Sequence, residues 1–245
     1  MKRLDIRDPR AFDMAVEALQ SDAIVVQLPT VFVLLAAPTT RGAAQLDRAK
    51  ARLQGKNYGT AIGSLARFLA QADPAHLPAG FSTAQQFERM TGSFIRLRFR
   101  EPGVHTPVMR DGSHQGVLLR GVHRELFKRL EAAFLGGAPD PLWVGRERDS
   151  NYAAPLCTSC NISGDPQGSI TELGRALDFA RDRNVGLMIT CPDSAEQLGS
   201  YPIFGFEKHR VSVHRDGPYL AYFKQQIPRH LRAWEQARER SLEAA

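Results

Sequence analysis

Small polar side chains gather in one short stretch, Thr158–Pro166, directly after an apolar run that is typical of a buried strand. Ser159, Asn161 and Ser163 alternate with a period of two, so in an extended chain their hydroxyl and amide groups share one face. Such groups at a strand end favour binding of a phosphate or a carboxylate. The same residue types are also common in an ordinary strand-to-turn transition. The stretch alone therefore allows either a binding site or a turn.

A second candidate for chemistry is basic. Apolar residues recur at helical spacing between residues 43 and 53, and Lys50, Arg52 and Lys56 stand at the C-terminal end of this predicted helix. The helix dipole favours cations at that end. The pattern predicts either a group of phosphate contacts or a solvated helix end.

A third pattern is the strict alternation over Ser93–Arg100, which predicts a strand with three apolar residues on one face and three arginines on the other. The arginine face fits two interpretations. It meets phosphate or nucleic acid, or it is a solvated face or a charged sheet edge.

The composition is that of a soluble globular protein, with 43% hydrophobic and 24% charged residues in a chain of 245. No apolar run reaches membrane-spanning length, and the start of the chain lacks the apolar core of a signal peptide. We therefore expect no membrane association and a cytoplasmic location. The net charge of +6 favours anionic ligands.

Common catalytic and metal-binding motifs are missing from the sequence. It contains no GxxxxGK[ST], GxGxxG, GxSxG or HExxH motif. The three cysteines are too few for a four-thiolate zinc site within one chain, and the pair Cys157 and Cys160 is expected to be structural and buried. The histidines are widely spaced, so we expect surface or core side chains and no metal site.

Predicted helices and strands alternate along the chain. Strand patterns over 23–28 and 30–36 follow a capped helix near residue 10, and a helix over 122–135 lies between further strands. This order predicts an α/β fold, a twisted mixed β-sheet flanked by helices, in one domain over residues 1–225. A charged helical tail is expected over 226–245.

The stretch Thr158-Ser159-Cys160-Asn161-Ile162-Ser163-Gly164-Asp165-Pro166 closely resembles the TSANxSGxP signature of the YrdC-like family. This family includes threonylcarbamoyl-AMP synthases and the carbamoyl-adenylate-forming domains of HypF-type proteins. Cys160 replaces the usual Ala, which is a small-for-small change. Lys50-Ala51-Arg52-Leu53-Gln54-Gly55-Lys56 is similar to the family's KxRxxxK element. The resemblance implies a single YrdC-like domain in which these basic residues hold the nucleotide phosphates.

Three shorter matches occur in the family's order. Arg120 ends a predicted strand. This resembles a family strand whose final Arg points into the nucleotide cleft. Ser200 stands at a Ser-Thr-hydrophobic element, and Arg215-Asp216-Gly217 resembles a closing Arg-x-Gly. The resemblance implies that Lys50 and Arg52 are the catalytic cations. It further implies a set of ATP and phosphate contacts, namely Lys50, Arg52, Lys56, Arg120, Ser159, Asn161, Ser200 and Arg215.

The motifs that correspond to the family's amino-acid-binding positions are altered in this sequence. The family's PTxTxYGL becomes Gln27–Leu34, which keeps Thr30 but places Phe32 where the family has Tyr, and Tyr58 stands in place of the Leu that follows the basic element. By position, Thr30, Phe32 and Tyr58 are expected to face the amino-acid substrate. Loss of polar partners there should change which amine is recognised.

The resemblance implies that ATP, bicarbonate and threonine or another small amine, with Mg²⁺, form a (threonyl)carbamoyl-AMP for modification of a tRNA adenosine. Two alternatives stay open. A divergent enzyme would make a carbamoyl-type adenylate on another substrate, including carbamoyl phosphate as donor. A non-catalytic protein would use its basic surface to bind double-stranded RNA or tRNA.

Overall fold

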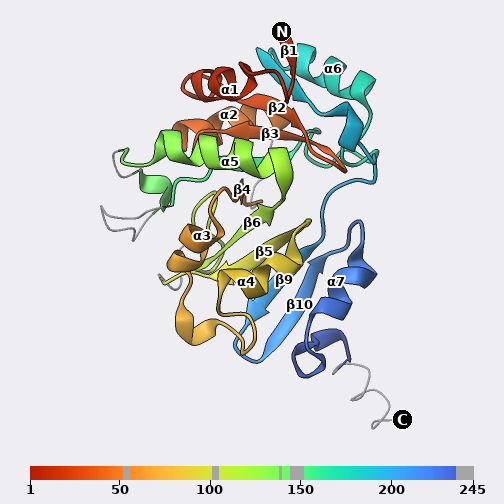
Figure 1. Ribbon diagram of the computed structural model, residues 1–245. Helices are drawn as coiled ribbons and strands as arrows, with labels where there is room; N and C mark the ends of the chain where they lie inside the picture. The colour runs from red at the N-terminus through yellow and green to blue at the C-terminus, as the bar shows by residue number, and fades with distance from the viewer. Residues whose placement is uncertain (52–55, 101–104, 138–139, 144–151, 236–245) are drawn as a thin grey trace.

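The computed structural model describes residues 1–51, 56–100, 105–137, 140–143 and 152–235. The strands are β1 (Lys2–Asp5), β2 (Ile24–Gln27), β3 (Phe32–Ala36), β4 (Gly59–Ala61), β5 (Ser93–Arg98), β6 (Ser113–Leu118), β7 (Leu156–Ser159), β8 (Leu187–Thr190), β9 (Ile203–Glu207) and β10 (Arg210–Arg215). They form one sheet in the order β1-β8-β2-β3-β7-β4-β6-β5-β9-β10, which Figure 1 shows running through the length of the molecule. Parallel and antiparallel neighbours both occur, so the predicted mixed sheet is confirmed.

Helices cover both faces of the sheet. They are α1 (Ala11–Leu19), α2 (Thr40–Lys50), α3 (Leu65–Gln71), α4 (Ala84–Phe87), α5 (Gly121–Phe134), α6 (Leu173–Asp182) and α7 (Leu220–Gln226). The buried apolar residues of α1 and α5 share one apolar cluster with alternate residues of β2 and β3. The other five helices bury apolar residues in a second cluster on the opposite face. The fold therefore has three layers, as expected for an α/β protein.

Local sequence fixes where α2 begins and ends. The Thr39 hydroxyl caps the helix by accepting a hydrogen bond from the Gly42 N–H at 3.0 Å. A Cβ at Gly42 would lie 2.0 Å from the Ala37 carbonyl oxygen, so only glycine allows the helix to start so close to the end of β3. The helix ends at Lys50, before Ala51 adopts a left-handed conformation with φ of 45°. These features place Lys50 beside the end of β7.

The face of the sheet that packs on α1 and α5 becomes polar at one end. Phe94 of β5 and Val117 of β6 belong to the cluster beneath α1 and α5. The next side chains on the same face are Arg96 and Gln115, which are half-buried. The predicted alternation of β5 is confirmed by the burial of its other face. β5 lies between β6 and β9, so it is not an edge strand.

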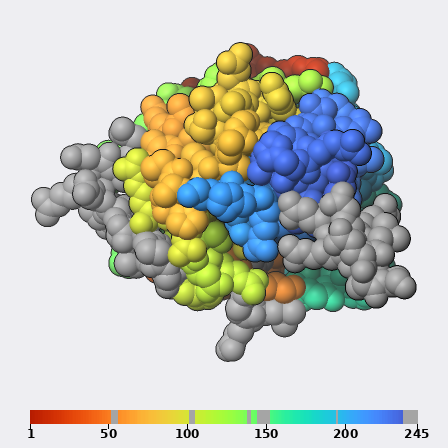
Figure 2. Space-filling view, turned by 90° about the horizontal axis from the view of Figure 1, so that it is seen from below, coloured from red at the N-terminus to blue at the C-terminus, as the bar shows by residue number. Residues whose placement is uncertain are grey.

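The chain after α7 packs back onto the sheet. Leu231 is buried, and the backbone of Arg232 forms a bridge with Val211 of β10. In Figure 2 the yellow segment around α4 lies against the blue segment of α7, in agreement with the contact between Gly92 and the Phe223 ring. Residues 236–245 of the expected helical tail lie outside the described residues, and the division after residue 225 stays a prediction.

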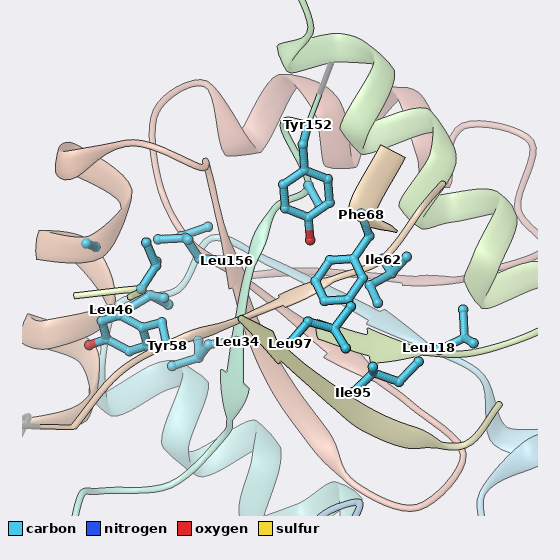
Figure 3. Packing of buried hydrophobic residues seen from close by; sticks show 14 of the residues in the cluster. Leu34, Leu46, Tyr58, Ile62, Phe68, Ile95, Leu97, Leu118, Tyr152 and Leu156 are labelled. Atoms are coloured by element: carbon cyan, nitrogen blue, oxygen red, sulfur yellow. The ribbon is translucent and has the colours of Figure 1, made fainter. Parts of the chain in front are cut away.

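A buried chain of polar groups crosses the second apolar cluster. The Thr60 hydroxyl lies 2.9 Å from Nε2 of His114 and forms a hydrogen bond with the Tyr152 hydroxyl. Nδ1 of His114 lies 2.8 Å from the Val108 carbonyl oxygen, which only accepts, so we assign the imidazole proton to Nδ1 and let Nε2 accept from Thr60. Figure 3 shows Tyr152 among the surrounding apolar side chains, including Phe68.

We expect Thr60→Val to lower the free energy of unfolding by about 1–3 kcal/mol, because it keeps the side-chain shape and leaves buried polar atoms of His114 and Tyr152 without this partner. Urea denaturation measures the change. Thr171→Val is the control, because Thr171 is a half-buried threonine that does not belong to this group of polar side chains. It should change stability by less than about 0.5 kcal/mol. Equal losses in the two variants would contradict the role assigned to Thr60.

His123 makes the stability depend on pH. Its imidazole is buried, with Nε2 lying 2.9 Å from the Gln27 carbonyl oxygen. Burial lowers the pKa of His123, and the hydrogen bond to the carbonyl opposes this shift without reversing it. The unfolded chain then binds this proton at a higher pH than the folded protein does, so stability falls as the pH drops below about 6.5.

We expect His123→Gln to flatten the loss of stability between about pH 7 and pH 5. Urea midpoints measured across this range give the slope. The pH dependence that remains in this variant includes a contribution from His214, whose pKa is also lowered by burial. His209→Gln, on the exposed turn between β9 and β10, should keep the slope of the unmodified protein. A His123→Gln slope as steep as that of the His209→Gln control would contradict the assignment.

Candidate anion-binding cleft

A cleft of about 280 Å³ opens on the α1/α5 face, where the sheet becomes polar. Its floor is apolar and includes Leu28, Val31, Val33, Phe94 and Cys157. Its walls come from the end of α2, the turn after β7, the strand pair β5/β6 and the segments around residues 200 and 215. The volume is near the lower end of small-molecule sites.

The walls carry a strong excess of positive charge. Among the described residues, five cationic side chains line the cleft, namely Lys50, Lys56, Arg96, Arg110 and Arg215. None of the described lining residues is an aspartate or a glutamate. A concave surface of one sign, with an apolar floor, concentrates its field on a ligand of the opposite sign. The cleft is therefore suited to an anion with several charges.

Lys50 holds the turn after β7. Its buried ammonium donates to the Ser159 carbonyl oxygen at 2.5 Å, to the Asn161 carbonyl oxygen at 2.7 Å and to Asn161 Oδ1 at 3.2 Å. The Ser163 N–H in turn donates to the Lys50 carbonyl oxygen at 2.9 Å. Lys50 thus supplies positive charge to the cleft wall and fixes the shape of the turn.

Ser159, Asn161 and Ser163 all line the cleft. The Ser159 hydroxyl donates to Asn161 Oδ1 at 2.6 Å, and Nδ2 of Asn161 donates to the Ile162 carbonyl oxygen at 2.8 Å. Since an amide nitrogen carries two hydrogens, Asn161 keeps one donor for a ligand. Ser159 acts mainly by orienting that amide. The sequence pattern placed these groups on one face, but it did not show this division of roles.

Arg215 and Gly217 form one unit with the segment around Ser200. Nε and Nη2 of Arg215 donate to the Tyr201 carbonyl oxygen at 3.1 and 2.6 Å, and the guanidinium lies over the Phe94 ring, 5.5 Å from its centre. A Cβ at Gly217 would lie 2.5 Å from the Ser200 carbonyl oxygen, so glycine is required for this approach. Arg215 stays accessible to water from the cleft, yet surrounding protein lowers its pKa to about 10 through desolvation.

The other predicted phosphate contacts are placed as follows. Lys56 is exposed and lines the cleft, whereas Arg52 lies outside the described residues. Ser200 lines the cleft, and its hydroxyl lies 2.5 Å from the Ser169 hydroxyl.

Arg120 is not brought into the cleft. It is exposed at the N-terminal end of α5 and is not among the lining residues. β6 ends at Leu118, earlier than predicted, and Gly121 turns the chain into α5 with a φ of 60°. Because Gln115 and Val117 face the cleft side, the alternation of the strand carries position 120 to the other side. Arg120 therefore does not line this cleft, and its expected contact with a nucleotide stays a prediction.

Thr30, Phe32 and Tyr58 lie beneath the cleft surface and do not line it. Phe32 belongs to the cluster on the opposite face, and the Tyr58 hydroxyl donates to Asp47 of α2 at 2.5 Å. Figure 3 shows Tyr58 beside Leu34 and Leu46. Thr30 is also buried. Their sequence neighbours, among them Val31 and Asn57, line the cleft instead, because a shift of one residue in an extended chain reverses the face.

Sequence reasoning missed Gln115 and Arg110 as lining residues. Gln115 is opposite Arg96 in the β5/β6 register, and its Oε1 accepts from Nε and Nη2 of Arg96 at 3.2 and 2.6 Å. Alternation put Gln115 on the cleft face, but only the strand pairing shows its partner. Arg110 stands in an irregular segment, which carries no periodic signal.

The cysteines are free and buried, as expected. Burial raises the pKa of Cys157 to about 12, while Arg215 and Lys50 act weakly in the opposite direction. A thiol held protonated in this way is a poor nucleophile. Among the described residues, no group of three or more His, Cys, Asp or Glu is placed to hold a metal ion.

None of the helices in the described ranges has both the length and the apolar composition needed to cross a membrane.

Solved structures share this fold. P. abyssi Sua5 complexed with L-threonine matches with a TM-score of 0.69 and 15% identity, over 95% of this chain and 62% of that chain. E. coli YciO matches with a TM-score of 0.59 and 14% identity, over 88% and 93%. Full-length HypF in the phosphate- and nucleotide-bound form matches with a TM-score of 0.58 and 14% identity, over 84% of this chain and 29% of that chain. This chain therefore spans less than two thirds of the Sua5 chain. Neither a family model nor a curated protein matches the sequence.

At these identities the likeness establishes the fold. The α/β architecture expected from the YrdC-like resemblance is confirmed.

Proposed function

We propose that this chain is a divergent YrdC-like transferase that forms a carbamoyl-type adenylate, such as (threonyl)carbamoyl-AMP, from ATP, bicarbonate and an amino acid. The observation that carries the proposal is the cleft itself. Five cations and the Asn161 amide converge there with no carboxylate among its described lining residues. Related folds have been solved with L-threonine and in a phosphate- and nucleotide-bound form, which supports the same ligand classes here.

The reaction has two balanced steps. The amine nitrogen forms a bond to the carbon of bicarbonate, water leaves, and an N-carboxylate results. A carboxylate oxygen then bonds to the α-phosphorus of ATP as the bond to the β-phosphate bridging oxygen breaks, so pyrophosphate leaves with the electron pair. Negative charge accumulates on the phosphoryl oxygens and the leaving group, so positioning and electrostatic stabilisation carry the catalysis.

The chain's own residues divide this work. Lys50 holds the turn so that the second N–H of the Asn161 amide can donate to a phosphate. Arg215 uses two donors on Tyr201 and has others left for an anion. The apolar floor of Val31, Val33 and Phe94 excludes water from one side of the reacting groups.

Magnesium has no dedicated protein site in this proposal. Mg²⁺ prefers carboxylate and other oxygen ligands, and the described lining of the cleft contains no carboxylate. We therefore treat Mg²⁺ as part of the ATP complex and assign it no ligand in the chain.

Asn161→Asp tests the proposal. The substitution keeps the side-chain shape, but it replaces an amide donor by a negative charge beside the phosphate position. We expect amine-dependent pyrophosphate release from ATP, with Mg²⁺ and bicarbonate present, to fall by about 100-fold or more. Threonine and a panel of other amines are the substrates. Unchanged release in the Asn161→Asp variant, or no release with any amine, would contradict the proposal.

The adenylate would pass to a second enzyme that transfers the carbamoyl group, with a tRNA adenosine as the acceptor that the family resemblance suggests. A second candidate function is binding of tRNA or double-stranded RNA without catalysis. The observation that favours it is a hollow beside the cleft, which shares Arg96 and Arg110 with it and adds Arg98 and His214. It predicts RNA affinity that falls with salt and survives Asn161→Asp.

A further inference from the structure

The cleft has two polar ends that differ in their structure. At one end, Lys50 and the turn after β7 form a closely hydrogen-bonded group around Asn161. At the other end, the strand pair β5/β6 presents Arg96 and Gln115, joined by hydrogen bonds from Nε and Nη2 to one amide oxygen. Both ends line the same cleft. A ligand that fills it touches both.

Arg96 is a half-buried cation held by a neutral partner. Among the described residues it takes part in no ion pair, and its side-chain hydrogen bonds go to Gln115. Burial lowers the pKa of Arg96, and the charge of Arg110 lowers it further, whereas Asp111 opposes these effects more weakly. A guanidinium kept from carboxylates and placed near a second one is stabilised when an anion lies between them.

Arg110 supplies the second guanidinium. It is exposed and lines the cleft with Arg96. Among the described residues, its ion-pair partner is Asp111, at 3.9 Å between Nε and Oδ2, and both of these side chains are largely in solvent. Such a contact holds Arg110 weakly, so its donors remain free to turn toward a ligand.

Under the proposed function, ATP and threonine do not need the positive charge of these two arginines. Lys56, Arg215 and the Asn161 amide line the part of the cleft assigned to the triphosphate, and the charge of Lys50 lies beside them. Threonine adds one carboxylate, and the residues expected to face the amino-acid substrate, Thr30, Phe32 and Tyr58, lie in the interior. The β5/β6 end of the cleft therefore has positive charge to spare for the amine substrate.

On the basis of the proposed function, we propose that Arg96 and Arg110 select an α-amino acid whose side chain carries an anionic group, a carboxylate or a phosphate. Arg96 is the specificity-determining residue, because Gln115 fixes the orientation of its planar fork toward such a group. The amine chemistry is unchanged, since the added anion binds to the wall and does not react.

Pyrophosphate release with aspartate, glutamate, O-phosphothreonine and threonine tests this selection. We expect kcat/KM for at least one anionic amino acid to exceed that for threonine by about tenfold or more. Arg96→Gln should remove this preference through KM of the amino acid and change KM of ATP less than about twofold. Arg98→Gln is the matched control, because Arg98 is on the same strand face and lines the neighbouring hollow but not the cleft.

The carboxylate and phosphate substrates distinguish the two sources of the anion, and a preference for either supports the inference. A preference for threonine over all three anionic amino acids would overturn it, as would an Arg96→Gln effect on KM of ATP in place of the amino acid.

Calorimetric binding of the same amino acids without ATP separates this inference from the proposed function. If no substrate gives pyrophosphate, the proposed function fails. Binding of an anionic amino acid that Arg96→Gln abolishes then still supports the selection, and absence of such binding refutes it.

Discussion

Lys50→Met is expected to weaken ATP binding by about 100-fold. The methionine keeps the aliphatic length, but it removes one positive charge and the donor to three oxygens of the turn after β7. The Asn161 amide then loses the contact that orients it. We expect the free energy of unfolding to fall by about 1–3 kcal/mol as well, because carbonyl groups of the turn lose a buried partner.

Arg48→Met is the matched control for Lys50→Met. Arg48 is an exposed residue in the last turn of the same helix and does not line the cleft. Both substitutions remove one charge from the C-terminal end of α2, so a difference between them reports the position of Lys50. Calorimetric titration with ATP gives the affinity, and urea denaturation gives the free energy of unfolding. Equal ATP affinity in the two variants would show that Lys50 is only a helix-end cation.

Arg215→Gln is expected to weaken ATP binding by about 10- to 100-fold. The substitution removes a guanidinium that stays charged at neutral pH even though its pKa is lowered to about 10. It also releases the Tyr201 carbonyl oxygen, so the segment around Ser200 loses its hold on the cleft wall. Calorimetric titration with ATP measures the loss.

Arg210→Gln is the control for Arg215→Gln on the same strand. Arg210 pairs with Glu207 at the surface, and it lies outside the cleft. Its replacement should leave ATP affinity unchanged. An equal loss in both variants would mean that general positive charge, not the position of Arg215, attracts the nucleotide.

The sequence predicted those parts of the fold that depend on local pattern. The strict alternation over residues 93–100 gave β5 and its buried face, and the apolar periodicity between residues 43 and 53 gave α2 with Lys50 at its end. The small polar residues after β7 were also visible as a turn. Each of these features depends on neighbours within a few residues.

The sequence could not predict which face of a strand meets the cleft. Arg120 and Phe32 were placed by their resemblance to family motifs, and in both cases neighbouring residues face the cleft side. A shift of one residue reverses the face of an extended chain. The pairing of Arg96 with Gln115 and the approach of Gly217 to Ser200 join distant segments, so no local pattern contains them.

The most direct test of the central claim is a calorimetric titration of the protein with ATP and Mg²⁺, repeated with Asn161→Asp. We expect one ATP site per chain, with an affinity that falls as salt is added and that is lost in the variant, because the cleft binds the triphosphate through its cations and the Asn161 amide. No ATP binding, or equal binding in the Asn161→Asp variant, would contradict it.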